Sequence, residues 1–214
     1  MNARRLTLVL LIASTALAAG CSRKGQIGDG GVYVTRSTCP LPGIVAGTGD
    51  VTLFNPVGST DASAIDVVAT MTNVRARCSD DGTTVTSVAT FDVVATGPRQ
   101  AEARQVVLPF YNVAMQGGTT VVAKQVGYVA LNFAAGAVRA QTRGEATVRI
   151  SKAAATLPAA IQKEITRPRK PGEVDAAIDP LSKPEIRDAV ARATFEQLLG
   201  FQLTDAQLRY NATR

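Results

Sequence analysis

Between Thr84 and Thr96 the chain alternates between two kinds of side chain, and this pattern limits the fold more than any other feature of the 214 residues. A period of two is that of a β-strand with one buried and one solvated face. The inward face is predicted to hold Val85, Ser87, Ala89, Phe91, Val93 and Ala95, while Thr84, Thr86, Thr90 and Asp92 lie outward. The segment therefore predicts a sheet that covers a core on one side.

The neighbouring segments extend this pattern into further strands. Residues 73–78 alternate in the same way, which turns Cys78 inward, and Asp80-Asp81-Gly82 follows as a hairpin turn because Asp and Gly tolerate positive φ. Other strands are predicted at 32–35, 106–114, 119–133 and 146–150. Roughly seven strands predict a mainly β fold, an antiparallel β-sandwich that is loosely immunoglobulin-like and covers 32–151.

Two residues in these strands carry positional information. Pro109 cannot donate to a ladder, so it is expected at an edge or a bulge of the sheet. Gly127 is a candidate for a β-bulge.

The last third of the chain is predicted to leave the sheet. Residues 152–182 are expected to form a Pro- and Ala-rich connector with a short helix at 159–165. Residues 183–214 are expected to form C-terminal helices, at 183–199 and 204–212.

Local signals at the helix ends support this prediction. Two pairs match the capping box, Ser182 with Glu185 and Thr204 with Gln207, and Gly200 stands where a left-handed C-cap is expected. The helix at 183–199 is apolar on two sides, so it is either buried on both or presents one side to a protein partner. The tail 183–214 is therefore a candidate protein-interaction element.

The N-terminus has the features of a secretory signal. Arg4 and Arg5 precede the apolar run Leu6–Ala19, which as a helix spans only about 21 Å and falls short of the bilayer core. The run leads into Leu17-Ala18-Ala19-Gly20-Cys21, which resembles the lipobox of bacterial lipoproteins, although that family usually has Leu where Ala18 stands.

The resemblance implies that residues 1–20 are a lipoprotein signal peptide and that Cys21 carries lipid. Several acyl chains on one cysteine hold a protein firmly in a membrane, and residues 21–31 then form a flexible tether. Ser22 after the anchor implies, by the sorting rule of that family, transfer to the outer membrane, facing the periplasm. The alternative is ordinary cleavage after Ala18, which leaves Cys21 as a spare thiol.

Cys39 and Cys78 are the remaining cysteines if Cys21 is lipidated. In an oxidising compartment a disulfide between them is expected. A metal site or a reactive thiol is the alternative, but two cysteines without a CxxC spacing or any His make a poor zinc site.

The absence of His removes most catalytic chemistry. No Ser-His-Asp triad, Cys-His dyad, HExxH zinc site or His-ligated haem can be built. Ser-Lys catalysis needs no His, but Ser151-Lys152 and Ser182-Lys183 are merely adjacent and no SxxK occurs. We therefore predict no catalytic, cofactor-binding or metal-binding residues, and expect a protein that is not an enzyme.

The net charge of +6 is spread along the chain, without basic residues interleaved with aromatics, so nucleic-acid binding is not expected. One local cluster, Arg167, Arg169 and Lys170, is predicted to be a solvated linker, with contact to an anionic surface as the alternative.

The chain also resembles uncharacterised envelope lipoproteins of alphaproteobacteria, on Cys39-Pro40, Leu108-Pro109-Phe110-Tyr111, Gly200 to Thr204 and Tyr210-Asn211. The resemblance implies a non-enzymatic outer-membrane lipoprotein that acts through protein contacts as an accessory part of an envelope assembly or maintenance complex. The alternative is a ligand-binding or hydrolytic lipoprotein that uses a cleft of the sandwich.

Overall fold

The computed structural model describes residues 27–28, 31–32, 37–167 and 178–213. The chain divides into two compact units, Met1–Thr35 with Thr166–Ala177, and Arg36–Ile165 with Ile178–Arg214. In the first unit, strand β1 (Ile27–Gly28) pairs antiparallel with β2 (Gly31–Val32).

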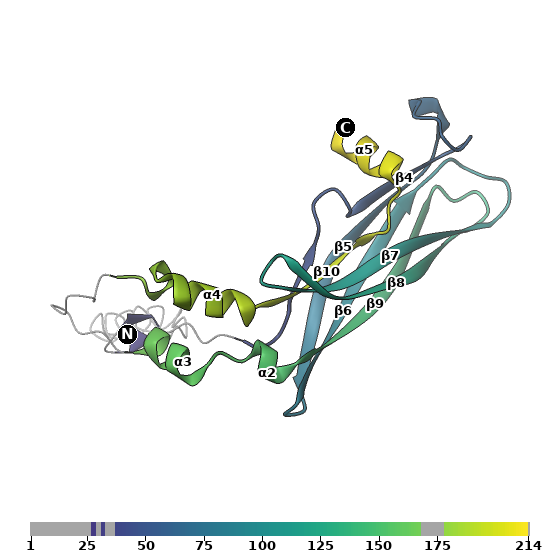
Figure 1. The fold of residues 1–214 in the computed structure, drawn as a ribbon. Helices are drawn as coiled ribbons and strands as arrows, with labels where there is room; N and C mark the ends of the chain where they lie inside the picture. The colour runs from purple at the N-terminus through teal and green to yellow at the C-terminus, as the bar shows by residue number, and fades with distance from the viewer. Residues whose placement is uncertain (1–26, 29–30, 33–36, 168–177, 214) are drawn as a thin grey trace, which may run out of the picture. The chain divides into compact units, whose positions relative to one another are not determined.

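The second unit contains two four-stranded sheets (Figure 1). Sheet I has the order β3 (Leu41–Ile44), β10 (Phe195–Phe201), β7 (Arg104–Gln116), β8 (Thr120–Phe133). Sheet II has the order β4 (Asp50–Phe54), β5 (Ile65–Asp80), β6 (Thr84–Thr96), β9 (Arg139–Ser151). All neighbours are antiparallel except β3 and β10.

Short helices complete this unit. They are η2 (Ala62–Ala64), α2 (Lys152–Ala155), α3 (Ala159–Thr166), η3 (Pro180–Ser182), α4 (Pro184–Arg192) and α5 (Asp205–Thr213). The bounds of α3 and α5 lie within a residue of the helices expected at 159–165 and 204–212. At the start of α5 the amides of Thr204 and Gln207 each bond to the side chain of the other, which is the geometry of a capping box.

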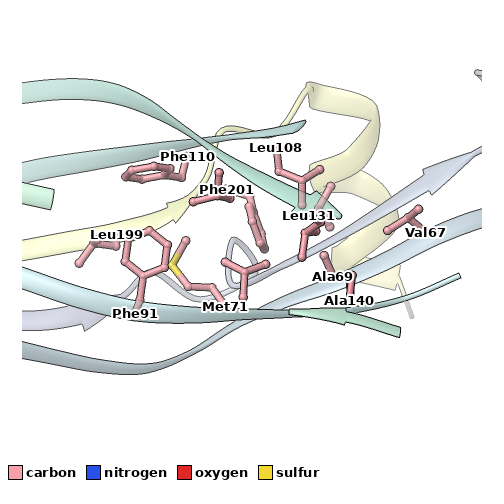
Figure 2. Packing of buried hydrophobic residues seen from close by; sticks show 14 of the residues in the cluster. Val67, Ala69, Met71, Phe91, Leu108, Phe110, Leu131, Ala140, Leu199 and Phe201 are labelled. Atoms are coloured by element: carbon pink, nitrogen blue, oxygen red, sulfur yellow. The ribbon is translucent and has the colours of Figure 1, made fainter. Parts of the chain in front are cut away.

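The main core lies between the two sheets (Figure 2). Phe91 from sheet II and Phe110 from sheet I meet edge to face, with their ring centroids 5.0 Å apart. Leu131, Leu199 and Phe201 are almost fully buried around them. The predicted β-sandwich is therefore confirmed at the level of a mainly β, two-sheet fold.

The alternation of residues 84–96 also appears in the structure as predicted. Val85, Ser87, Ala89, Phe91, Val93 and Ala95 are all buried in β6. The predicted turn joins β5 to β6, with Gly82 at φ +97°. Asp81 holds this turn, because its carboxylate accepts hydrogen bonds from the amides of Thr83 and Thr84 at 2.9 and 2.7 Å.

The prediction that Pro109 lies at an edge or a bulge is wrong. Pro109 lies in β7, a central strand, but the ladder between β7 and β10 ends at the pair Phe110–Phe201. The Pro109 carbonyl accepts a bond from the amide of Gln202, at 2.9 Å. The N and C=O of one residue point to the same side of a strand. The N–H that Pro109 lacks would therefore point toward β10, just beyond the last residue pair of that ladder.

The bulge predicted at Gly127 is wrong. The register of β7 and β8 shifts between Ala114 and Met115 instead, whereas Gly127 pairs regularly with Phe110. A Cβ on Gly127 would lie 2.5 Å from Cζ of Phe110, so this glycine makes room for an aromatic ring. Close approach of a neighbouring side chain is the other common reason for a glycine inside a strand.

The helix predicted at 183–199 is wrong beyond Arg192. α4 ends there, and residues 195–201 form β10, a central strand between β3 and β7. Gly200, expected as a helix C-cap, therefore lies inside a strand, and Lys183 rather than Ser182 is the N-cap of α4. The sequence pattern also misses β3 and β4, because each has five residues or fewer and lacks a long alternation.

A buried polar cluster explains why β10 escapes the pattern. Gln197, which is fully buried, accepts a hydrogen bond from Ser87 Oγ at 2.7 Å and donates to Asn112 Oδ1 and the Ala146 carbonyl, both at 3.0 Å. Asn112 Nδ2 in turn donates to the Thr147 carbonyl at 3.0 Å. Side chains of sheet I thus bond to sheet II inside the sandwich, where partnered polar groups carry little net cost.

Candidate interaction surface

The solvent side of β7 and β8 is apolar over three successive rows, which lie between the polar pair Gln105–Asn132 and Lys124. Because Leu108 and Phe110 point into the core, the residues that alternate with them in β7 face outward. The strand register places these residues opposite partners in β8 that share the same side. We define the outer apolar face of sheet I as Val107, Pro109, Tyr111, Val126 and Tyr128.

Three members of this face are strongly exposed. The exposed fractions are 71% for Tyr128, 51% for Val107 and 48% for Val126. They occupy three successive outward rows of the β7–β8 ladder, since Pro109 pairs with Tyr128 and Tyr111 with Val126. Contiguous apolar surface of this kind marks contact sites more often than scattered single residues do.

Hydrogen bonds hold Tyr111 in place on this face. Thr48 Oγ1 donates to the Val45 carbonyl at 2.9 Å and lies 2.8 Å from Tyr111 Oη. Thr48 has one hydroxyl proton and uses it on Val45, so Tyr111 donates to Thr48. Burial raises the pKa of Tyr111, and its ring lies 5.9 Å from the ammonium of Lys124.

The first half of β8 adds an open strand edge to this face. Every residue from Thr120 to Val126 is exposed, although the strand pairs with β7 along its length. The segment is rich in valine, with Val121 at 55% and Val122 at 46% exposure. Exposed apolar edges of this kind are templates for pairing with another chain.

The outer face of sheet II has the opposite chemistry. The strand register places on it five exposed arginines, Arg75, Arg77, Arg139, Arg143 and Arg149. The acidic residues Asp92 and Glu145 lie among them. Asp92 accepts hydrogen bonds from Asn73 Nδ2 at 2.7 Å and from Arg143 Nε at 3.1 Å, which lower its pKa. The two outer faces of the sandwich thus differ, one apolar and one basic and hydroxyl-rich.

A groove of about 510 Å³ lies beside β4 and α5. Leu53, Phe54, Val57 and Tyr210 are among its walls, and the rings of Phe54 and Tyr210 meet edge to face at 5.1 Å. Asp66, the acidic residue of the lining, is bonded to Arg104 at 2.7 Å. The lining is chiefly apolar and includes the hydroxyls and amides of Ser59, Thr60 and Gln207.

The predicted disulfide between Cys39 and Cys78 is confirmed, with the two Cα atoms 6.0 Å apart. It ties the segment before β3 to the end of β5. The lipidation residue Cys21, the signal peptide and most of the tether lie outside the described residues, as do Arg169 and Lys170.

The described part of the chain has neither a membrane-spanning helix nor a cluster of metal ligands. No helix among residues 37–167 and 178–213 has the length and apolarity needed to cross a membrane. In the same ranges, no group of three or more Cys, Asp or Glu side chains could hold a metal ion.

The tail 183–214 does not form the long helix with two apolar sides that the sequence predicts. In the tail 183–214, the apolar residues Phe195 and Leu199 are buried in the sandwich, and Ala189 packs with Leu157 near α3. The outer apolar face is not among the sites predicted from the sequence. Its signal is nevertheless present in the sequence, because Val107, Pro109 and Tyr111 alternate with Leu108 and Phe110, so this strand is apolar on both sides.

Comparison with known proteins gives no relative: no family model, curated protein or solved structure matches the chain.

Proposed function

We propose that this chain is a non-enzymatic lipoprotein of the outer membrane that faces the periplasm and acts through protein–protein contacts. The lipobox-like sequence ending at Cys21 supports the anchor. The observation that carries the contact function is the outer apolar face of sheet I. In the proposal the protein is an accessory part of an envelope assembly or maintenance complex.

The partner contact moves from the expected helical tail to this face. β10 is a central strand whose inward residues Phe195, Leu199 and Phe201 are buried, so the apolar face predicted on a helix at 183–199 is used inside the sandwich. Val107 and Tyr128, by contrast, are among the exposed apolar side chains on the two strands. We also propose that the strands of the sandwich have a loosely immunoglobulin-like arrangement. The contact function does not depend on this arrangement.

The anchor is tested by replacing Cys21. Cys21→Ala removes the acceptor of the lipid, so the protein is expected in the soluble periplasmic fraction rather than the membrane fraction. Retention of the variant in the outer membrane after cell fractionation would count against lipidation.

The contact function is tested by a charge on the outer apolar face. Val107→Glu is expected to reduce several-fold the partner protein that co-purifies with the tagged chain, because burying the carboxylate at a contact costs free energy. Val94→Glu is the matched control, since Val94 is 39% exposed on the outer face of sheet II. Recovery of the same amount of partner protein with Val107→Glu and with Val94→Glu would contradict the proposal.

A second candidate function is supported by the groove beside β4 and α5. Its volume of about 510 Å³ lies in the range of small-molecule pockets, and its walls Phe54 and Tyr210 suit an apolar ligand. Binding of a fluorescent apolar probe that is lost in Phe54→Ala but kept in Val107→Glu would favour this alternative.

A further inference from the structure

The sandwich has four sheet edges, and three of them are short or partly covered. β3 has four residues. β4 has five, and Asn211 of α5 donates to the carbonyls of Gly47 and Asp50 beside it, at 2.9 and 2.8 Å. On β9, the side chain of Asn112 donates to the Thr147 carbonyl, which points to the open edge because the neighbouring Ala146 points its backbone groups to β6. Natural sheets commonly protect their edges by such means.

The edge on β8 is the exception. This strand has 14 residues, and among the described residues its ladder partner is β7 alone. Within the described chain, no hydrogen bond reaches the outward edge between Val121 and Tyr128. Lys124 is the one charged residue of the strand.

The pairing of β7 shows which groups point outward. The Pro109 carbonyl bonds to Gln202 on the side away from β8, so Pro109 and Tyr128 are a pair without mutual hydrogen bonds. Tyr128 must therefore point its own N–H and C=O to the open edge. Because direction alternates along a strand, Val126 and Lys124 do the same.

We propose that β8 pairs antiparallel with β8 of a second copy of this chain, around a two-fold axis at Val126. In that register Val126 lies opposite its own copy, and Lys124 lies opposite Tyr128 of the other chain. Both are outward-bonding residues, so each pair exchanges two backbone hydrogen bonds. The contact is isologous, as in the commonest homodimers, and joins two copies of sheet I into one sheet.

The side chains fit this register. Lys124, which lies 5.9 Å from the ring of Tyr111 in its own chain, comes opposite the ring of Tyr128 of the second copy, which also attracts it. No like charges lie opposite each other. On the inner side Gln125 lies opposite Gly127, so no bulky pair clashes. Val126 and Tyr128, 48% and 71% exposed in one copy, bring the two outer apolar faces together. If the two-fold axis lay at Gln125 instead, Lys124 would lie opposite Val126 of the second copy and would lose its contact with Tyr128 of that copy.

The test uses the full chain in its oxidised form. Val126→Cys is expected to give a disulfide-linked dimer on a non-reducing gel, because facing residues of a bonded antiparallel pair have Cα atoms about 5.5 Å apart. Val94→Cys, an exposed valine on the other sheet, is expected to form no such link, and neither is the parent chain. In a second arm, Val126→Lys places two ammonium groups across the axis and is expected to shift the sedimenting species from dimer to monomer, with Val94→Lys unchanged.

Two outcomes would overturn the inference. One is a parent chain that sediments as a monomer at all concentrations together with a Val126→Cys variant that fails to cross-link. The other is cross-linking of the new thiol at position 126 only to a different protein, which would assign the edge to a foreign strand. Neither outcome depends on the proposed anchor or on the partner contact that Val107→Glu tests.

Discussion

Each sheet has a glycine that allows a phenylalanine of the neighbouring strand to lay its ring against the backbone. Phe110 lies over Gly127 in sheet I, and Phe91 lies over Gly144 in sheet II. A Cβ at either glycine would overlap the ring. Because the two rings also pack on each other, this group of four residues joins the layers at the centre of the core.

Replacement of one of these glycines tests that role. Gly127→Ala is expected to lower the free energy of unfolding by about 1–3 kcal/mol, since its Cβ would lie 2.5 Å from Cζ of Phe110 and the ring must move. In Gly43→Ala the nearest atom is at 3.4 Å, an ordinary contact, so a change within about 0.5 kcal/mol is expected. Urea denaturation measures both, and equal losses would contradict the role assigned to Gly127.

The turn between β5 and β6 gives the protein an acid-sensitive element. Lys152 and the amide of Gly82 hold the pKa of Asp80 below its usual value. Hydrogen bonds from Thr83 and Thr84 do the same for the pKa of Asp81. A carboxyl whose folded pKa is lowered stabilises the fold above its unfolded pKa, about 3.9, and loses this effect as the pH falls through the folded value.

We therefore expect the midpoint of thermal unfolding to fall as the pH drops from about 5 to about 2. Asp81→Asn is expected to lower the midpoint at neutral pH and to flatten the acid limb, because the neutral carboxamide accepts the bonds from Thr83 and Thr84 more weakly than a carboxylate and does not titrate. Asp205→Asn, at the exposed start of α5, is the control. An acid limb as steep in Asp81→Asn as in the parent chain would contradict this assignment.

At the scale of elements, the buried polar cluster around Gln197 connects the two sheets. Gln197→Ala is expected to reduce the free energy of unfolding by about 2–4 kcal/mol, because it leaves a cavity and removes partners of Ser87 and Asn112. Gln202→Ala, whose side chain is exposed, is expected to change it by less than about 0.5 kcal/mol. Chemical denaturation compares the two, and similar small effects would show that the cluster carries little stability.

The position of β10 makes a prediction about truncation. A chain that ends after residue 193 loses the strand between β3 and β7, so we expect no cooperative unfolding transition. A chain that ends after residue 203 loses only α5 and is expected to unfold cooperatively. Circular dichroism during heating distinguishes the two, and a cooperative transition in the shorter chain would show that β10 is dispensable.

Sequence patterns predict some elements and miss others for physical reasons. The alternation predicts β6 because every inward side chain of that strand is small or apolar, so the period of two is uninterrupted. The same approach misses β10 because Gln197 interrupts its inner side, while Phe195 and Leu199 are also four residues apart, the spacing of a helix face. The partners that make a buried glutamine favourable come from β6, β7 and β9, far away in the sequence.

At the scale of the molecule, the sandwich has two outer faces of different chemistry. The face of sheet II carries arginines and hydroxyls and suits contact with water or anions. The face of sheet I is apolar over three rows of β7 and β8 and continues to the open edge of β8. The sequence could not predict this division, because it does not say which strands share a sheet. It follows only when the register places Val107, Tyr128 and Val126 on the same side.

The measurement that tests the contact function most directly is site-specific photo-cross-linking in cells. A photoreactive residue at position 107 is predicted to give a discrete, reproducible cross-linked partner, while the same residue at position 141, exposed on the outer face of sheet II, gives none. Identical cross-linking patterns from the two positions, or no product at position 107, would contradict the proposal that the outer apolar face of sheet I is the contact surface.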